Sequence, residues 1–213
     1  MTESRAAGRY LAFEIDLGGF NNILMHFEIM VALAWLTRRT LVLPPSTPFY
    51  LLGSEPRSLL DFFDLEALRL HVDVLGADEF APGTASHQAF HQFLCERGHA
   101  PGWNAVDDVL VHPPNAVTTR LELIHRLCGR RPVGFSASEE QCEILYFPAT
   151  REHRMFGVFE TFFLFADPEN ERRVRALVRD AVRYRPEILR LAERAIRMPP
   201  LAGARFSAMH VRR

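Results

Sequence analysis

The chain has 213 residues, of which 48% are hydrophobic and 24% are charged, and these values exclude a disordered or fibrous protein. Its formal net charge of −1 provides no global field that would attract nucleic acid or an anionic membrane. All 25 basic residues are arginine, which excludes a Schiff-base lysine and a Walker-type phosphate-binding lysine from this chain.

The cysteines predict neither a disulfide framework nor a zinc site, because they are odd in number and have no CxxC spacing: Cys95, Cys128 and Cys142. No apolar signal-peptide core precedes the first glycine-rich turn. The longest apolar stretch, residues 23–36, is interrupted by His26 and Glu28 and is shorter than the roughly 20 residues that span a bilayer. We therefore expect a soluble chain with no transmembrane segment and no export signal.

The N-terminal region predicts a βαβ unit. Residues 9–15 form a short apolar run typical of a buried strand, residues 18–22 a glycine-containing turn, and residues 22–37 a largely apolar helix. A second apolar run, residues 41–43, follows and ends at two prolines. This order implies parallel strands and a right-handed crossover, with the turn at the carboxyl edge of the sheet.

The rest of the chain is assigned by the same periodicities. We expect helices at 58–70, 87–95, 168–184 and 186–197, strands at 71–75, 109–111 and 205–212, a long loop over 76–104 around one short helix, and core residues within 156–165. The fold class is therefore α/β, with a parallel sheet flanked by helices. A parallel-sheet protein rarely ends on a strand with functional side chains, so we expect the chain to be the front portion of a longer protein.

The turn Gly18-Gly19-Phe20-Asn21-Asn22 is the first candidate site. Two glycines allow a ligand to approach the backbone closely, and the free N–H groups of a helix N-terminus favour an anion such as pyrophosphate. The turn lacks the GxGxxG spacing, since a bulky Phe follows the second glycine. A tight turn with a purely structural role is the alternative.

The last residues, His210-Val211-Arg212-Arg213, form the second candidate. Side chains two apart on a strand share a face, so His210 and Arg212 point together and Arg213 points away. Ligands gather at the carboxyl ends of parallel strands, and arginine suits bidentate phosphate binding. The alternative is a solvated, charged chain end.

Three further patterns favour ordinary structural roles. His87 and His91 have metal-ligand spacing but no third ligand, which favours a surface or loop-packing role. Asp107-Asp108 is interpreted as a solvated acidic pair rather than a divalent-ion site. The arginines of 172–197 alternate with acidic residues, which favours a solvated helix face over nucleic-acid binding.

Four segments together resemble the GDP-fucose protein O-fucosyltransferase family: the glycine turn at 18–22, the segment RTLVLPP at 39–45, YRPEI at 184–188, and FSAMHVRR at 206–213. The resemblance implies the N-terminal half of a GT-B-type fold. It divides the chain into a Rossmann-like domain, residues 1–200, and the first strand of a second Rossmann-like domain, residues 201–213.

By position, the resemblance implies inverting transfer of fucose from GDP-fucose to a hydroxyl of a protein or glycan, with no obligatory metal and no other cofactor. Asn21 would lie near the sugar and phosphates, and Arg212 would bind the β-phosphate and stabilise the departing GDP. The implied donor-binding residues are Gly18, Gly19, Phe20, Asn22, His210 and Arg213.

Two departures from the family pattern keep other hypotheses open. Some members carry a glutamate base where this chain has Gly18, and the nearby carboxylates are Glu14 and Asp16. The segments that follow His-x-Arg-Arg in the family, which hold most guanine and ribose contacts, are absent here. A non-catalytic member that binds a glycan or a protein is the second hypothesis, and a nucleic-acid-binding module, disfavoured by the charge, is the third. A bacterial member would be cytoplasmic, whereas a eukaryotic one would act in the ER or Golgi lumen.

Overall fold

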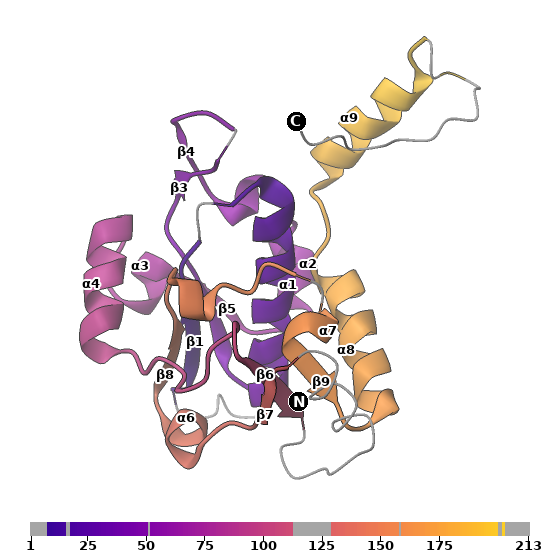
Figure 1. The fold of residues 1–213 in the computed structure, drawn as a ribbon. Helices are drawn as coiled ribbons and strands as arrows, with labels where there is room; N and C mark the ends of the chain where they lie inside the picture. Colours follow the sequence, from indigo (N-terminus) through magenta and orange to yellow (C-terminus); the bar gives the residue numbers. More distant parts are fainter. Residues whose placement is uncertain are drawn as a thin grey trace, which may run out of the picture.

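Helices cover both faces of a four-stranded parallel sheet in this computed structural model (Figure 1). The structure describes residues 8–15, 18–50, 52–112, 129–157, 159–199 and 202. The sheet has the order β5-β2-β1-β8, and each neighbouring pair is parallel. Its strands are β1 (Tyr10–Phe13), β2 (Thr40–Leu43), β5 (Val74–Gly76) and β8 (Ile144–Phe147).

The predicted βαβ unit is confirmed. Helix α1 (Phe20–Thr37) joins β1 to β2, and Leu11 pairs with Leu41 in a parallel register. The helix begins two residues before the predicted start, since Gly19 is its N-cap. The parallel pairing confirms the α/β fold class and places the turn before α1 after the carboxyl end of β1.

The remaining elements follow in chain order. They are β3 (Thr47–Pro48), β4 (Pro56–Arg57), η1 (Leu59–Asp61), α2 (Leu65–Arg69), α3 (Ala77–Phe80), α4 (His87–Arg97), β6 (Asp108–His112), β7 (Arg131–Val133), α6 (Ala137–Gln141), η2 (Arg151–His153), α7 (Phe159–Phe162), β9 (Phe163–Phe165), α8 (Pro168–Ala181) and α9 (Pro186–Arg197). A second parallel sheet has the order β7-β6-β9.

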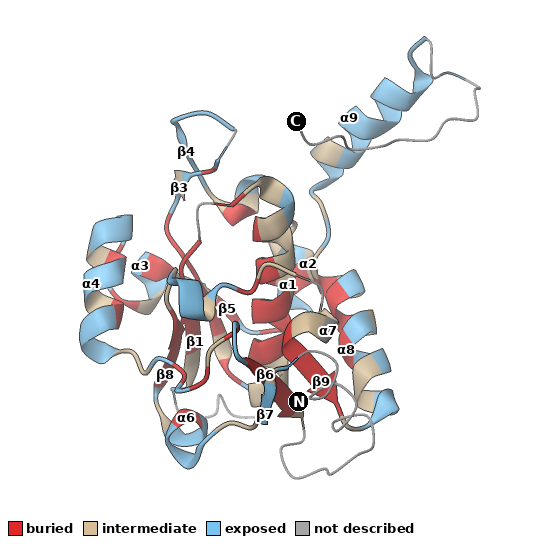
Figure 2. Cartoon of the chain, in the orientation of Figure 1, coloured by how far each residue is buried: buried red, intermediate tan, exposed pale blue. Residues whose placement is uncertain are grey.

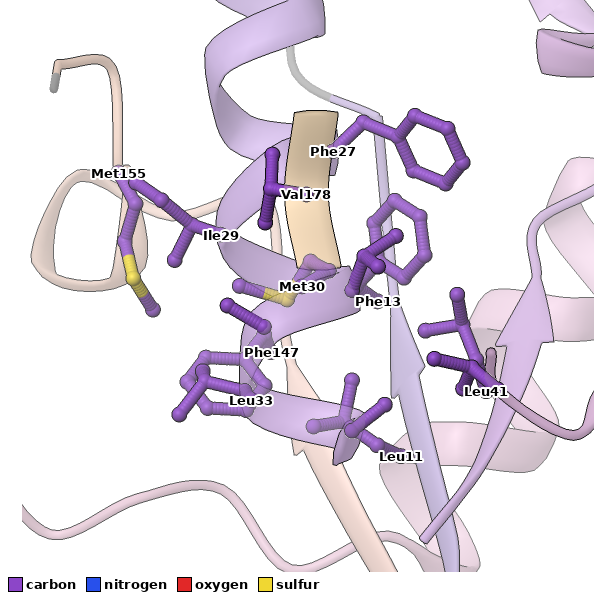
Figure 3. Close-up of a cluster of buried hydrophobic side chains, with 14 of the residues drawn as sticks. Leu11, Phe13, Phe27, Ile29, Met30, Leu33, Leu41, Phe147, Met155 and Val178 are labelled. Atoms are coloured by element: carbon purple, nitrogen blue, oxygen red, sulfur yellow. The ribbon is translucent and has the colours of Figure 1, made fainter. Parts of the chain in front are cut away.

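The sheet separates two hydrophobic clusters, because successive side chains of a strand point to opposite faces. One face of the sheet, with Leu11, Phe13 and Phe147, packs on α1, and α1 in turn contacts α8 (Figure 3). The other face, with Ala12 and Tyr146, is covered by α3 and α4. Because both faces are buried, the strands are apolar throughout rather than alternating in polarity, as parallel sheets require (Figure 2).

Helix α1 is apolar because it lies inside the domain. Among the described helices, α1 is long and apolar enough to cross a membrane, with a mean hydropathy of 1.2. The core helix of a globular domain meets the same criteria, and half of this helix is buried against its own domain. The sequence predicts no span here because His26 and Glu28 interrupt the apolar run, and in the structure His26 is buried and Glu28 half-buried.

The predicted helix over 58–70 is wrong as a single element. Two short elements with separate N-caps stand in its place. The Ser58 side chain accepts a hydrogen bond from Leu60 N–H and begins η1, and the Asp64 side chain accepts from Glu66 N–H and begins α2. The strand expected at 71–75 begins only at Val74. The loop expected over 76–104 contains α3 as well as the predicted α4.

Arg39, which follows the C-terminal end of α1, contacts a different part of the fold. Its guanidinium group is buried and donates to the backbone oxygens of Glu139, Cys142 and Tyr10, at 2.8, 2.8 and 3.2 Å. It therefore satisfies the carbonyl groups at the end of α6 and ties that helix to the amino end of the sheet.

The arginines of α8 and α9 match the predicted solvated helix faces. Arg172 pairs with Glu169 and Arg190 with Glu187, and these side chains are mostly exposed. Helix α9 has no buried residue and extends away from the rest of the domain (Figure 2). The strand predicted at 205–212 lies outside the described residues.

Asp108 is not the solvated residue that the sequence predicted. Its carboxylate is only 1% exposed, accepts from Arg131 Nε at 2.9 Å and accepts from Asn104 N–H at 3.0 Å. Burial by itself raises the pKa of Asp108, but these hydrogen bonds outweigh it, and the pKa lies below its usual value. The pair fixes the start of β6 to its neighbour β7.

We expect Asp108→Asn to lower the free energy of unfolding by about 1–3 kcal/mol at pH 7, because a hydrogen-bonded buried charge is lost. Because the pKa of Asp108 is lower in the folded chain, its stabilising effect is present at pH values above the pKa of the unfolded chain, near 3.8. The difference in stability between the variant and wild type should therefore shrink as the pH falls below that value. Urea unfolding at several pH values measures it. Asp107→Asn, at an exposed neighbour, is the control and should change stability by less than about 0.5 kcal/mol.

Candidate functional site

The first candidate site is the N-terminus of α1, beyond the carboxyl end of β1. Gly19 caps the helix with φ −62° and ψ 155°, and its carbonyl oxygen accepts from the N–H groups of Asn22 and Ile23. No described side chain caps the first turn, and no acidic residue lies in it. The first N–H groups of an 18-residue helix are therefore directed toward a position suited to an anion.

The two glycines of the turn serve different purposes. A Cβ atom on Gly18 would lie 3.1 Å from both Asn22 Cβ and Phe156 Cζ, so the close packing favours glycine there. A Cβ atom on Gly19 would meet no atom of the described residues within 4 Å, and its backbone angles are available to any residue. Within the described part of the chain, neither packing nor backbone conformation demands glycine at Gly19.

Phe20 anchors the turn by packing against other aromatic rings. Its ring lies 4.7 Å from the ring of Phe62 and 6.1 Å from that of Phe63, so it packs into the aromatic core rather than projecting into the open space. The bulky residue after the glycines, which departs from the GxGxxG pattern, thereby positions the first turn of α1. Asn21 is exposed and Asn22 half-buried.

The second candidate lies outside the described residues. The structure therefore does not test the placement of His210, Arg212 and Arg213, and their convergence with Asn21 on one cleft stays a prediction. The same holds for Asp16, one of the two carboxylates suggested as a base.

Glu14, the other suggested base, is held inside the domain. Its side chain is 4% exposed, its Oε1 lies 2.7 Å from His91 Nδ1, and its Oε2 accepts from Ala149 N–H at 3.0 Å. A carboxylate with both oxygens engaged and no open surface is closed to an acceptor hydroxyl. His91 is exposed, in agreement with the predicted surface or loop-packing role, and its pairing with Glu14 joins α4 to the end of β1.

His26 lies one helical turn below Asn22, between the rings of Phe13 and Phe156, at centroid distances of 5.6 and 6.1 Å. Within the described chain neither of its ring nitrogens has a hydrogen-bond partner. Burial lowers its pKa from 6.5 to about 4, so the imidazole is neutral at physiological pH. The sequence shows that His26 interrupts an apolar helix, but it does not show that the imidazole lacks a described hydrogen-bond partner.

The described residues contain no group of three or more His, Cys, Asp or Glu side chains arranged to hold a metal ion. His87 and His91 stack with parallel rings, 6.5 Å apart, instead of converging on a common point. An anion at the α1 turn is thus the ligand chemistry that the described geometry favours.

One family model matches most of the chain. A family model described as GDP-fucose protein O-fucosyltransferase matches residues 10–213. A crystal structure of POFUT1 in complex with GDP-fucose is 14% identical, with a TM-score of 0.44, and the match covers 92% of this chain and 56% of that one. A POFUT1 structure in complex with GDP is 15% identical, with a TM-score of 0.48, and the match covers 91% and 55%. No curated protein sequence gives a significant match.

Proposed function

We propose, since this chain belongs to the GDP-fucose protein O-fucosyltransferase family, that it forms part of an enzyme that transfers fucose from GDP-fucose with inversion. The acceptor would be a hydroxyl group of a serine or threonine in a protein, or of a glycan. The chain spans about 56% of the POFUT1 structures that it matches, so the activity is proposed for the full-length protein. The observation that carries the proposal is the open, uncapped N-terminus of α1 at Gly19.

The leaving group of this reaction is a nucleoside diphosphate, so stabilising its growing negative charge is the main catalytic requirement. The N–H groups at the start of α1 would contribute hydrogen bonds to the pyrophosphate, with Asn21 near the sugar. Arg212 would bind the β-phosphate and His210 the nucleotide. The chain has no lysine, so arginine is its permanent cation for this purpose.

Gly19→Ala tests where the donor binds. We expect this variant to fold like wild type, because the added Cβ meets nothing within 4 Å and the backbone angles suit alanine. A bound pyrophosphate would lose its close approach to the backbone, so the Kd for GDP-fucose should rise at least tenfold, roughly 1.4 kcal/mol. Isothermal titration calorimetry on the full-length protein measures the change.

Gly76→Ala is a matched control, because Gly76 is also a helix N-cap, with φ −76° and ψ 160°, and a Cβ atom there also meets nothing within 4 Å. It should leave the Kd unchanged. Unchanged binding in Gly19→Ala, or equal losses in the two variants, would contradict a donor site at the α1 turn.

A second candidate function is the binding of a glycan or protein without catalysis. It is favoured by Gly18, which stands where some family members carry a glutamate base, and by the closed position of Glu14. Release of GDP from GDP-fucose in the presence of acceptor distinguishes the two functions. Donor binding without turnover would support the non-catalytic one.

A further inference from the structure

A polar cluster lies on the opposite face of the sheet from α1, between α4 and the ends of β1 and β8. His91 and Cys95, one turn apart on α4, place the sulfur 3.5 Å from His91 Nε2 and 4.0 Å from Nδ1. The same imidazole ring places Nδ1 2.7 Å from Glu14 Oε1. A thiol, an imidazole and a carboxylate thus follow one another in space.

The carboxylate orients the histidine. Glu14 is buried, and Ala149 N–H occupies its other oxygen at 3.0 Å. In the neutral tautomer whose Nδ1–H donates to Glu14, Nε2 is the acceptor nearest the sulfur. A nucleophile, a base and an orienting group of these kinds activate thiols in hydrolases.

Tyr146 of β8 lies beneath this cluster. Its side chain is 3% exposed, and its hydroxyl group makes no hydrogen bond within the described part of the chain. Burial, together with the nearby Glu14 and Cys95, raises the pKa of Tyr146, so the hydroxyl stays protonated. A buried hydroxyl beside the sulfur can stabilise negative charge that forms there.

The cluster is open only on the side of the thiol. The Cys95 residue is exposed and the His91 side chain is 52% exposed, whereas Glu14 and Tyr146 are buried. A reagent from solvent can therefore reach the sulfur but not the carboxylate. The other titratable group beside His91 is His87, whose ring stacks on it at 6.5 Å.

We propose that Cys95 is a nucleophilic thiol, activated by His91 and Glu14, that undergoes exchange with small-molecule disulfides. His91 Nε2 accepts the thiol proton as the sulfur attacks one sulfur of the disulfide. The new S–S bond joins Cys95 to one half of the reagent, and the other half leaves as a thiolate that takes the proton back from His91. No external oxidant is needed, since the disulfide is reduced as Cys95 is oxidised.

Cys142 provides an internal comparison. It is half-buried, its Sγ donates to Glu139 O at 3.2 Å, and it accepts from the Arg39 guanidinium group at 3.6 Å. Both Cys95 and Cys142 are free thiols. We therefore expect the mixed disulfide to form selectively at Cys95.

The test uses the full-length protein with Cys128→Ser, treated with oxidised glutathione, and follows the mixed disulfide at each cysteine by peptide mass spectrometry. Cys95 should react at least tenfold faster than Cys142 at pH 7. His91→Gln and Glu14→Gln should each slow the reaction of Cys95 at least fivefold. Loss of His91 should also shift its pH–rate profile to higher pH, an effect that altered exposure alone would not produce.

His91→Gln at a half-exposed position should keep the fold, which circular dichroism verifies, and a variant at the stacked neighbour, His87→Gln, is the matched control with an unchanged rate. The proposal is overturned if Cys95 reacts no faster than cysteine in an unstructured peptide. It is equally overturned if folded His91→Gln reacts at the wild-type rate.

Discussion

Replacing Arg212 by lysine in the full-length protein should lower the kcat for fucosyl transfer about 10²–10³-fold, the effect of removing one preorganised donor. Lysine keeps the positive charge but loses the planar group that can bind two phosphate oxygens. The charge on the departing diphosphate is largest in the transition state, so kcat should change more than KM. Single-turnover kinetics with GDP-fucose measures the chemical step.

Arg213→Lys is the matched control for this prediction. The two residues are adjacent, and on a strand their side chains point to opposite faces, so the conservative change at Arg213 should cost much less unless that side chain also reaches the donor. Equal and small effects in the two variants would remove Arg212 from the proposed mechanism.

Lowering the pH from 7 to 4 should reduce the free energy of unfolding by about 3 kcal/mol through His26 alone. The folded pKa, about 4, lies below the unfolded value of 6.5, because burial disfavours the imidazolium ion. Between about pH 4 and pH 6.5, the unfolded chain therefore binds a proton at His26 that the folded chain does not bind. The contribution of His26 is present above pH 6.5 and is lost as the pH falls toward 4.

His26→Leu isolates this effect, because leucine fills the apolar site without titrating. Urea unfolding of both proteins between pH 7 and 4 should show a much weaker loss of stability in the variant. At pH 7 the variant should be as stable as wild type or more stable, since two buried nitrogens without described partners are removed. Identical pH dependence in the two proteins would contradict a buried, neutral His26.

The boundaries that sequence analysis predicted well have local causes. Helix α9 begins at Pro186 and ends at Arg197, as predicted, because a proline begins it and further prolines follow it. The βαβ unit was also predicted, because an apolar run, a glycine turn and an apolar helix in that order have few other arrangements. Residues 58–70 were predicted less well. Asp64 fits the polar face of one continuous helix and is also a favoured N-cap, which is its role at the start of α2.

The sequence by itself determined the α/β class, the turn before α1 and the family motifs, because each depends on residues close together in the chain. The tertiary structure alone decided three other features: β8 as the neighbour of β1, the contact of Glu14 with His91, and the burial of Asp108 by Arg131. Their partners are 23 to more than 130 residues apart in sequence, and no local periodicity encodes such a pairing. Those side chains acquire their chemistry only when burial and strand order bring them together.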